Sequence, residues 1–302
     1  MTAEEHLHDD QNQTARKLTG LNEIFQKDPG GRGLLQGGVK NPLDALYETL
    51  KDAERAVLLT GFPVCLPDGR VTGETDGPSG TANIAWALEQ AGASVTALAD
   101  RNCLPQVKAA FRARGCEAAP MEVPENGTER FLEKLFSDLA PTHLITLERP
   151  GKAKDGHFYN MRGGVIDEML TDTDPIMRIA ARHGAVILSV GDGGNELGMG
   201  ALRPLAEKRV PLGGLICADA AADIALVSGV SNWWGWGIAG VLSFLCGRDL
   251  LPSERTEREV LEAVIRSGGA DGVTKKAELT VDALSLEEQL AVLRAVRETV
   301  LP

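Results

Sequence analysis

The sequence predicts an α/β fold of the doubly wound type, with a mainly parallel sheet sandwiched by helices in a Rossmann-like arrangement. Short segments that are apolar throughout alternate along the chain with segments of about 10 to 15 residues of helical pattern, which is typical of strands buried between covering helices. Glycine is frequent, at 34 residues, and aromatic residues make up only 4%. That composition favours tight loops and closely packed helices. No internal repeat or low-complexity linker interrupts the chain, so a single domain is expected.

The strands and helices can be assigned from apolar runs and from Gly and Pro punctuation. The segments expected to form strands are 55–63, which ends in a tight loop, 94–99, 142–147, 185–190 and 224–228. The segments expected to form helices are 42–54, 79–91, 104–114, 128–139, 173–183, 254–266 and 286–300. Residues 1–40 are polar and end in a glycine-rich stretch, which predicts an N-terminal arm, and residues 41–302 are expected to form the α/β domain.

Composition excludes several classes of function. The formal net charge of -12 argues against a nucleic-acid partner, because phosphate binding needs concentrated Lys and Arg. No apolar run reaches the length of about 18 residues that a membrane span needs, and the polar N-terminus does not resemble a targeting peptide. Five widely spaced Cys residues without a C-x-x-C pair do not indicate a disulfide framework or a zinc site. We expect a cytoplasmic protein that acts on a small molecule.

In a doubly wound fold the ligand crevice lies outside the carboxyl ends of the strands, and the first candidate loop there is 74–80. Glu74 and Asp76 flank the start of a predicted helix, and Gly77 and Gly80 would allow a ligand to approach the backbone closely. Free N–H groups at a helix start can hold a carboxylate or phosphate. The alternative is that Asp76 and Ser79 only cap the helix.

The second candidate loop is 148–163, which follows a predicted strand and has little apolar content for packing. Long loops of this kind in compact domains are often functional, and Arg residues can grip a carboxylate with two hydrogen bonds. The alternative is a solvated surface loop. The side chains that we expect to face a ligand are Glu148, Arg149, Tyr159, Asn160 and Arg162.

The third candidate loop, 191–200, is the most distinctive. It places Asp192, Asn195 and Glu196 among glycines that include Gly193 and Gly194. The loop fails the dinucleotide fingerprint, because the third glycine of that motif would fall at Glu196, and it lacks a Walker Lys-Ser/Thr pair. Two carboxylates and an amide on a flexible backbone suit a hard cation, or proton transfer with one pKa raised by its neighbour.

A fourth loop, 228–237, gathers three of the four Trp residues, with Ser231 and Asn232 at an expected helix start. These Trp side chains either pack in the core or wall the pocket. The G-x-S-x-G and H-E-x-x-H signatures are absent, which argues against a serine hydrolase or a zinc peptidase.

At these loops the sequence resembles the D-glutamate cyclase family, specifically the domain that forms the C-terminal part of the longer animal mitochondrial enzymes and stands alone in many bacteria. The resemblance covers roughly residues 40 to 300. The segments that carry it are 60–63, 74–78, 148–151, 155–156, 159–163 and 191–200.

The resemblance implies a hydro-lyase that converts D-glutamate to 5-oxo-D-proline and water. The α-amine would attack the γ-carboxyl, which requires a base, donors for the oxyanion and an acid for the departing hydroxide. On this hypothesis Arg149 or Arg162 binds the α-carboxylate, helped by the amides of residues 77–80, Asp192 or Glu196 is the base, and Glu148 or Asp76 is the acid. Ser79, Tyr159, Asn160, Asn195, Gly193 and Gly194 would complete the substrate-binding set.

A divalent cation, Mg²⁺ or Mn²⁺, could polarise the γ-carboxyl if held by some of Glu74, Asp76, Asp192 and Glu196. Two other functions use the same loops: acyl or phosphoryl transfer on another amino or sugar acid, and carboxylate binding without turnover. A homo-oligomer is left open by the sequence.

Overall fold

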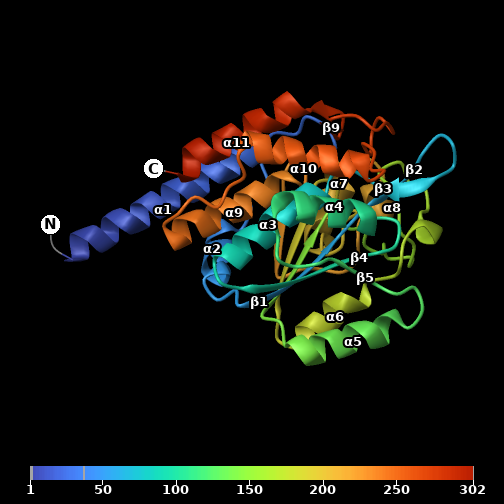
Figure 1. The fold of residues 1–302 in the computed structure, drawn as a ribbon, viewed down its shortest axis with the longest axis horizontal. Helices are drawn as coiled ribbons and strands as arrows, with labels where there is room; N and C mark the ends of the chain where they lie inside the picture. Colours follow the sequence, from blue (N-terminus) through green and yellow to red (C-terminus); the bar gives the residue numbers. More distant parts are fainter. Residues whose placement is uncertain (1–2, 37, 302) are drawn as a thin grey trace.

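A six-stranded sheet forms the centre of the structure, a computed structural model that describes residues 3–36 and 38–301 (Figure 1). Every pair of neighbouring strands is parallel, which confirms the predicted doubly wound sheet. Across the sheet the strands are β5 (Met121–Glu122), β4 (Ser94–Ala99), β1 (Arg55–Thr60), β6 (His143–Leu147), β7 (Val186–Gly191) and β8 (Ile224–Val227).

The chain reverses its winding direction between β1 and β6, which lie side by side at the middle of the sheet. From β1 the chain winds outward through β4 to β5, then returns to β6 and winds through β7 to β8. The two central strands end together: Thr60 Oγ1 donates to the Leu147 carbonyl at 2.6 Å, and the Gly61 N–H donates to the Glu148 carbonyl at 3.1 Å. This switch point is where an open α/β sheet leaves a crevice for a ligand.

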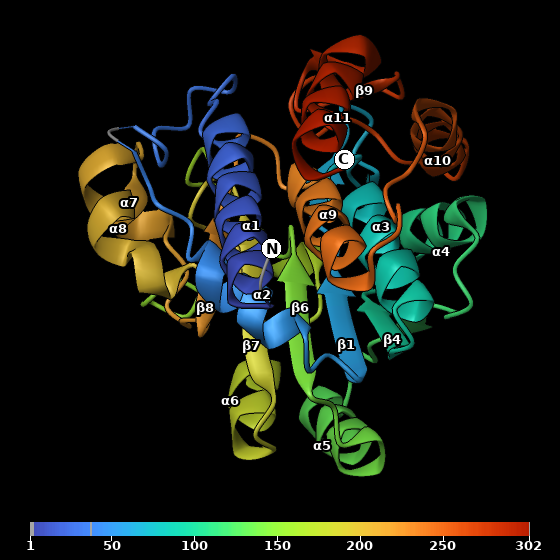
Figure 2. The same ribbon diagram turned by 90° about the vertical axis from the view of Figure 1, so that its left-hand side faces the viewer.

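Helices cover both faces of the sheet (Figure 2). Alternate residues of β1 point to opposite faces, so Leu58 packs into one core cluster while Val57 and Leu59 pack into another. The second face is covered by α5 (Thr128–Leu139) and α6 (Pro175–Arg182). The first face is covered by α2 (Leu43–Leu50), α3 (Pro78–Gln90), α4 (Leu104–Arg114) and α9 (Trp233–Cys246). Outside these helices lie α10 (Glu254–Arg266), which packs against α4, and α11 (Leu286–Val300), which packs against α9 (Figure 2).

Several short elements were not predicted from the sequence. Two antiparallel hairpins, β2 (Pro63–Cys65) with β3 (Val71–Gly73) and β9 (Thr280–Val281) with β10 (Leu284–Ser285), lie outside the main sheet. The segment 55–63, expected to be a strand that ends in a tight loop, forms β1 up to Thr60 and then turns: Gly61 takes a φ of 115° and Pro63 starts the first hairpin. The remaining short elements are η1 (Asp167–Met169), η2 (Gly200–Leu202), α7 (Arg203–Arg209) and α8 (Gly213–Ile216).

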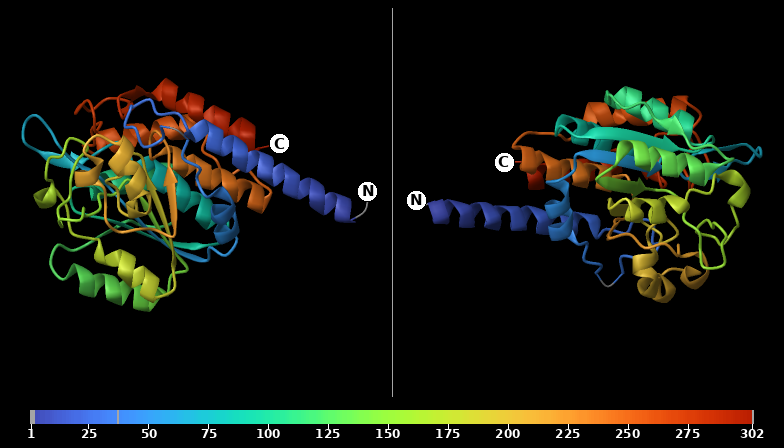
Figure 3. Two further views of the ribbon diagram at one scale, coloured as in Figure 1. Left: turned by 180° about the vertical axis from the view of Figure 1, so that it is seen from behind. Right: turned by 90° about the horizontal axis from the view of Figure 1, so that it is seen from below.

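The N-terminal segment, predicted as an arm, contributes to the core. Helix α1 (Ala3–Phe25) packs against α11 and α9 through the buried side chains of Leu18, Leu21 and Phe25, and its first turns project beyond the other elements (Figure 3). Leu34 is buried in a third cluster beside α7. Residues 1–2 and 37 of this segment lie outside the described residues. Among the described helices, none has the length and apolar character needed to cross a bilayer.

The position of α3, which carries one of the candidate loops, depends on a close crossing with α9. Gly80 of α3 faces Gly235 of α9, and a Cβ built on Gly235 would lie 2.6 Å from the Gly80 carbonyl oxygen. Only glycine allows the two backbones to approach this closely.

We expect Gly235→Ala to destabilise the protein by about 1–3 kcal/mol, because the added methyl meets backbone atoms that cannot move aside. Gly214→Ala in α8 is the control, since a Cβ there meets only the Glu207 side chain at 4.0 Å. Urea unfolding measures both changes. Equal stability of the two variants would show that the helix crossing tolerates a methyl group.

Candidate active site

Three loops and the β9–β10 hairpin enclose a cleft of about 450 Å³ at the switch point. Its walls are strongly acidic. The carboxylates that line it are Glu74, Glu148, Asp192, Glu196 and Asp282. The cations that line it are Arg32, Arg162 and Lys275. Cleft formation brings together residues from both ends of the chain, which no local pattern in the sequence could indicate.

Glu148 follows β6 directly and turns into the cleft. Its φ of 45° is unusual for a residue other than glycine, and this conformation follows from the hydrogen bonds of its backbone, which donates to the Val190 carbonyl and accepts from the Gly61 N–H. Its side chain is buried and accepts a 2.5 Å hydrogen bond from the Ser231 hydroxyl. A carboxyl group is therefore held at the exact boundary between β6 and its loop.

Asp76 and Asn232 hold the start of α3 against the start of α9. Asp76 accepts hydrogen bonds from the N–H groups of Gly77, Ser231 and Asn232 at 2.8 to 3.0 Å. In return, Oδ1 of Asn232 accepts from the N–H groups of Gly77 and Gly80 at 2.9 and 2.7 Å. The amides predicted to bind a substrate anion are therefore already occupied.

Two further expectations for this loop are corrected. The Ser79 hydroxyl donates to the buried Glu257 of α10 and takes part in a buried network behind the cleft. Gly80 packs against Gly235 of α9, as described above. Neither residue lines the cleft.

Glu196 holds the shape of the 191–200 loop. Its carboxylate accepts three hydrogen bonds from the N–H groups of Asp192, Gly193 and Gly194 at 2.7 to 3.0 Å. These bonds occupy both carboxylate oxygens of Glu196 and the N–H groups of Gly193 and Gly194, two residues predicted to bind the substrate. The Glu196 side chain therefore binds the backbone of its own loop. Its role in the structure is to position Asp192, and this removes the basis for assigning Glu196 as the base.

Asn195 retains a free acceptor in the cleft. Its amide nitrogen donates to the Tyr159 carbonyl at 2.8 Å, while its Oδ1 has no hydrogen-bond partner in the described part of the chain. The side chain is 1% exposed. Buried acceptors without a partner are uncommon and need an explanation, and a ligand donor in the cleft would supply one.

Some residues of the 148–163 loop stabilise the fold, and others line the cleft. Arg149 is fully buried beneath the cleft, where its guanidinium pairs with Asp100 at 2.5 Å and donates to the carbonyls of Gly61 and Thr171. It is not available to a substrate, which corrects its predicted role. The Tyr159 ring is also buried and its hydroxyl donates to Asp155, so it supports the loop from outside the cleft.

Asn160 and Arg162 do line the cleft. Oδ1 of Asn160 accepts from the N–H groups of Arg162 and Gly164, which fixes the turn that presents Arg162. The Arg162 guanidinium lies at the exposed mouth and forms no ion pair within 4 Å in the described residues. Lys275, on the opposite C-terminal segment, is also without an ion pair there.

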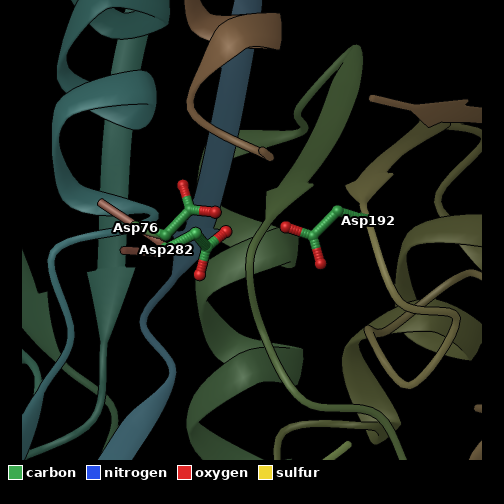
Figure 4. A group of neighbouring side chains, drawn as sticks. All are labelled: Asp76, Asp192 and Asp282. Atoms are coloured by element: carbon green, nitrogen blue, oxygen red, sulfur yellow. The ribbon is translucent and has the colours of Figure 1, made fainter. Parts of the chain in front are cut away.

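Arg32 and Asp282 are site residues that the sequence analysis missed. Arg32 contacts Asp192 at 2.6 Å and Asp282 at 2.8 Å. Figure 4 shows Asp76, Asp192 and Asp282 converging on one point from three separate elements. The isolated Arg32 within the glycine-rich stretch was a signal that could have been used. Asp282 had none, because the hairpin that carries it is too short to show a pattern.

Burial governs the protonation of this cluster. Desolvation raises the pKa of Glu74, Glu148 and Asp192 well above ordinary values, and nearby carboxylates add to the effect. The pKa of Asp76 is raised to about 8, mainly by burial and then by Asp282, against the opposing effect of Arg32. Asp76 therefore carries a proton near neutral pH unless a cation compensates its charge, and the other three groups bind a proton more readily than exposed carboxyl groups do.

Two sets of carboxylates have the spacing to hold a metal ion. Oxygens of Asp76, Asp192 and Asp282 lie within 4.8 Å of one another, and so do oxygens of Glu148, Asp192 and Glu196. Glu74, one of the predicted ligands, belongs to neither set among the described residues. Carboxylate oxygens are the ligands that Mg²⁺ and Mn²⁺ prefer.

The fold and the cleft together define a doubly wound α/β protein with an acidic cleft at its switch point. The chain belongs to the D-glutamate cyclase-like family, since the model of that family's C-terminal domain matches residues 21–297. It is 30% identical over 243 residues to the mitochondrial D-glutamate cyclase of Homo sapiens. This match covers 76% of the chain but only 39% of the human protein.

Among solved structures, an exopolyphosphatase-related protein from Bacteroides fragilis aligns with 86% of this chain and 57% of its own. The sequences are 11% identical and the TM-score is 0.36, and a likeness of that size carries no argument about function.

We expect Arg149→Met to destabilise the protein by about 3–5 kcal/mol, because it leaves Asp100 as a buried charge without a partner. The double variant Arg149→Met/Asp100→Asn should recover part of that loss in urea unfolding. If Arg149→Met instead kept its stability and lost only ligand binding in the cleft, the guanidinium would belong to the ligand site after all.

Proposed function

We propose that this chain is a hydro-lyase that cyclises D-glutamate to 5-oxo-D-proline and water in the cleft at the switch point. The observation that carries the proposal is the gathering of buried carboxyl groups opposite two unpaired cations in one cleft, in a member of the D-glutamate cyclase-like family. The cleft volume of about 450 Å³ is ample for an amino acid of this size.

The charges of the cleft complement those of glutamate. Arg162 and Lys275 stand at its mouth and can bind the substrate carboxylates. The unpartnered Oδ1 of Asn195 and the carboxylate of Asp192 lie deeper and can accept hydrogen bonds from the α-ammonium group. A substrate held at both ends in this way must fold so that its amine approaches its γ-carboxyl, which is the proximity that the reaction needs.

Each proton of the reaction can be assigned. Glu148 protonates one oxygen of the γ-carboxylate, the α-ammonium gives a proton to Asp192, and the free amine then attacks the γ-carbon, forming the C–N bond of the ring. The ring nitrogen gives its second proton to Glu148, and the hydroxyl group on the γ-carbon takes the proton held by Asp192 and leaves as water. Both carboxyl groups thereby return to their starting states. A buried carboxyl group with a raised pKa is suited to both tasks, because its pKa lies nearer the operating pH than that of an exposed carboxyl group.

Stabilisation of the oxyanion falls to a positive charge. The backbone N–H groups of Gly77, Gly80, Gly193 and Gly194, which were predicted to bind the substrate, donate to Asn232 and Glu196 and are not free to stabilise the oxyanion. Lys275 is one candidate. A Mg²⁺ or Mn²⁺ ion held by Asp76, Asp192 and Asp282 is the other, and it would share Asp192 and Asp282 with Arg32.

Purified protein incubated with D-glutamate should form 5-oxoproline, detected by chromatography, and L-glutamate is the matched control. Asp192→Asn should lower kcat about 100-fold or more through loss of the base, with the thermal unfolding temperature showing that the fold is kept. The assay is repeated after chelation and again after adding back Mg²⁺ or Mn²⁺. Activity that survives chelation assigns the oxyanion to Lys275.

Absence of 5-oxoproline under all of these conditions would overturn the proposed reaction. Calorimetric binding of D-glutamate without product would then identify a carboxylate-binding protein, and product formed only with ATP would identify a transfer enzyme.

The raised pKa of Asp76 predicts how stability depends on pH. A group whose pKa rises on folding stabilises the protein fully below its unfolded value, and this contribution is lost as pH rises through the folded value. For Asp76 that window runs from about 4 to about 8. Asp76→Asn should remove up to about 1.4 kcal/mol per pH unit of this slope.

Urea unfolding at pH 5, 6, 7 and 8 measures the effect. The variant also carries a cost that does not depend on pH, since its amide nitrogen would face the Ser231 N–H. Parallel stability curves for the two proteins would mean that Asp76 is ionised across this range.

A further inference from the structure

Arg32 reaches the cleft from the N-terminal segment, far in sequence from every other charged residue that lines it. We propose that Arg32 is a positioning residue of the active site: its guanidinium is a built-in cation that joins Asp192 to Asp282 and so fixes the β9–β10 hairpin as one wall of the cleft. Its effect on turnover rests on the proposed function, whereas its effect on the assembly of the cleft does not.

The contacts of Arg32 fit this role. Nη1 lies 2.6 Å from Oδ2 of Asp192 and donates to Oδ2 of Asp282 at 3.0 Å, and Nη2 lies 2.8 Å from Oδ1 of Asp282. The planar guanidinium thus grips Asp282 with two nitrogens and reaches Asp192 with one of them. The side chains of Asp192 and Asp282 are only 2% and 5% exposed, so water screens these contacts little while Arg32 is in place.

Arg32 is held rigidly on its own side. The carboxylate of Asp28 accepts hydrogen bonds from the N–H groups of Arg32 and Gly33 at 3.1 and 2.9 Å, which closes a turn. That turn rests on Gly229, just after β8: a Cβ on Gly229 would meet the Lys27 carbonyl, and Arg32 Nη1 donates to the Gly229 carbonyl at 3.4 Å. The sheet therefore determines where the guanidinium lies.

The backbone of the hairpin is held by hydrogen bonds with Thr75, Asp271 and Gln289, and Arg32 compensates the charge of its turn. Asp282 and Ala283 form its turn with φ of 55° and 63°, a conformation that most residues avoid. In the described part of the chain, the Asp282 carboxylate has hydrogen bonds and ion pairs only with Arg32. Without the guanidinium, this turn would place a buried carboxylate beside Asp192 with no counter-charge.

The experiment removes the guanidinium and returns it as a free ion. Arg32→Ala leaves a site shaped for guanidinium between two carboxylates, and millimolar guanidinium is added to the purified variant. Urea, which is planar and of similar size but uncharged, is the matched control ligand. Arg203→Ala is the matched control variant, since Arg203 is also mostly buried and pairs with Asp219 but does not line the cleft.

We expect Arg32→Ala to lower kcat about 100-fold through misplacement of Asp192, and guanidinium, but not urea, to restore at least one tenth of the lost activity. Guanidinium should also raise the unfolding temperature of Arg32→Ala by a few degrees, because the vacated site exists only in the folded state and the denaturing effect of millimolar guanidinium is small. It should do neither for Arg203→Ala. Arg32→Lys keeps the positive charge but lacks the planar geometry of a guanidinium. Its kcat should lie between those of the wild-type protein and Arg32→Ala, and its KM should change less than its kcat.

The readouts separate the possible failures. If the wild-type protein makes no 5-oxoproline but guanidinium still stabilises Arg32→Ala, the proposed reaction is wrong and the positioning role stands. If urea acts as well as guanidinium, or if neither restores activity or stability, Arg32 contributes only packing and the proposal is overturned. Should Arg32→Ala not fold, full activity of Arg32→Lys would overturn it in the same way.

Discussion

The burial of six carboxyl groups around one cleft is the constraint on which the rest of this structure depends. A buried carboxylate without a partner is too costly to persist, and the protein meets this cost differently at each position. Asp76 and Glu196 receive backbone N–H groups, Glu148 receives a hydroxyl, and Asp192 and Asp282 share Arg32. Glu74 has no hydrogen-bond partner among the described side chains, and burial raises its pKa. The carboxyl groups of the site therefore differ in how their negative charge is compensated.

These partners are available only because of the fold. The parallel strands bring the ends of β1, β6 and β7 to one edge, and the close crossing of α3 and α9 puts the N–H groups of Ser231 and Asn232 against Asp76. A looser crossing would leave both helix starts without partners for their N–H groups. The same contact that packs the core thus also supports the acidic cluster, so stability and function cannot be separated at this point.

Local patterns in the sequence were enough to predict most strands and helices and the edge where the site lies. They could not distinguish a ligand-binding residue from one that holds its own loop: Arg149 and Glu196 have the residue types and positions of site residues, yet their partners are Asp100 and the backbone of the 191–200 loop. Arg32 and Asp282 were missed because their meeting depends on tertiary structure alone, across 250 residues of sequence. Hairpins with strands of two residues are too short to show a period.

These contacts give the N-terminal segment a structural role, because it places Arg32 in the cleft. Ordering a chain end and burying an arginine both cost free energy, and a buried ion pair alone does not reliably repay the desolvation of its charges. Leu21, Phe25 and Leu34 are fully buried, and each contributes about 1.5–3 kcal/mol through the hydrophobic effect. Apolar burial on either side of the Asp28 turn can therefore hold Arg32 in place, and the cleft obtains a fixed cation whose position is set by packing rather than by the attraction between the charges.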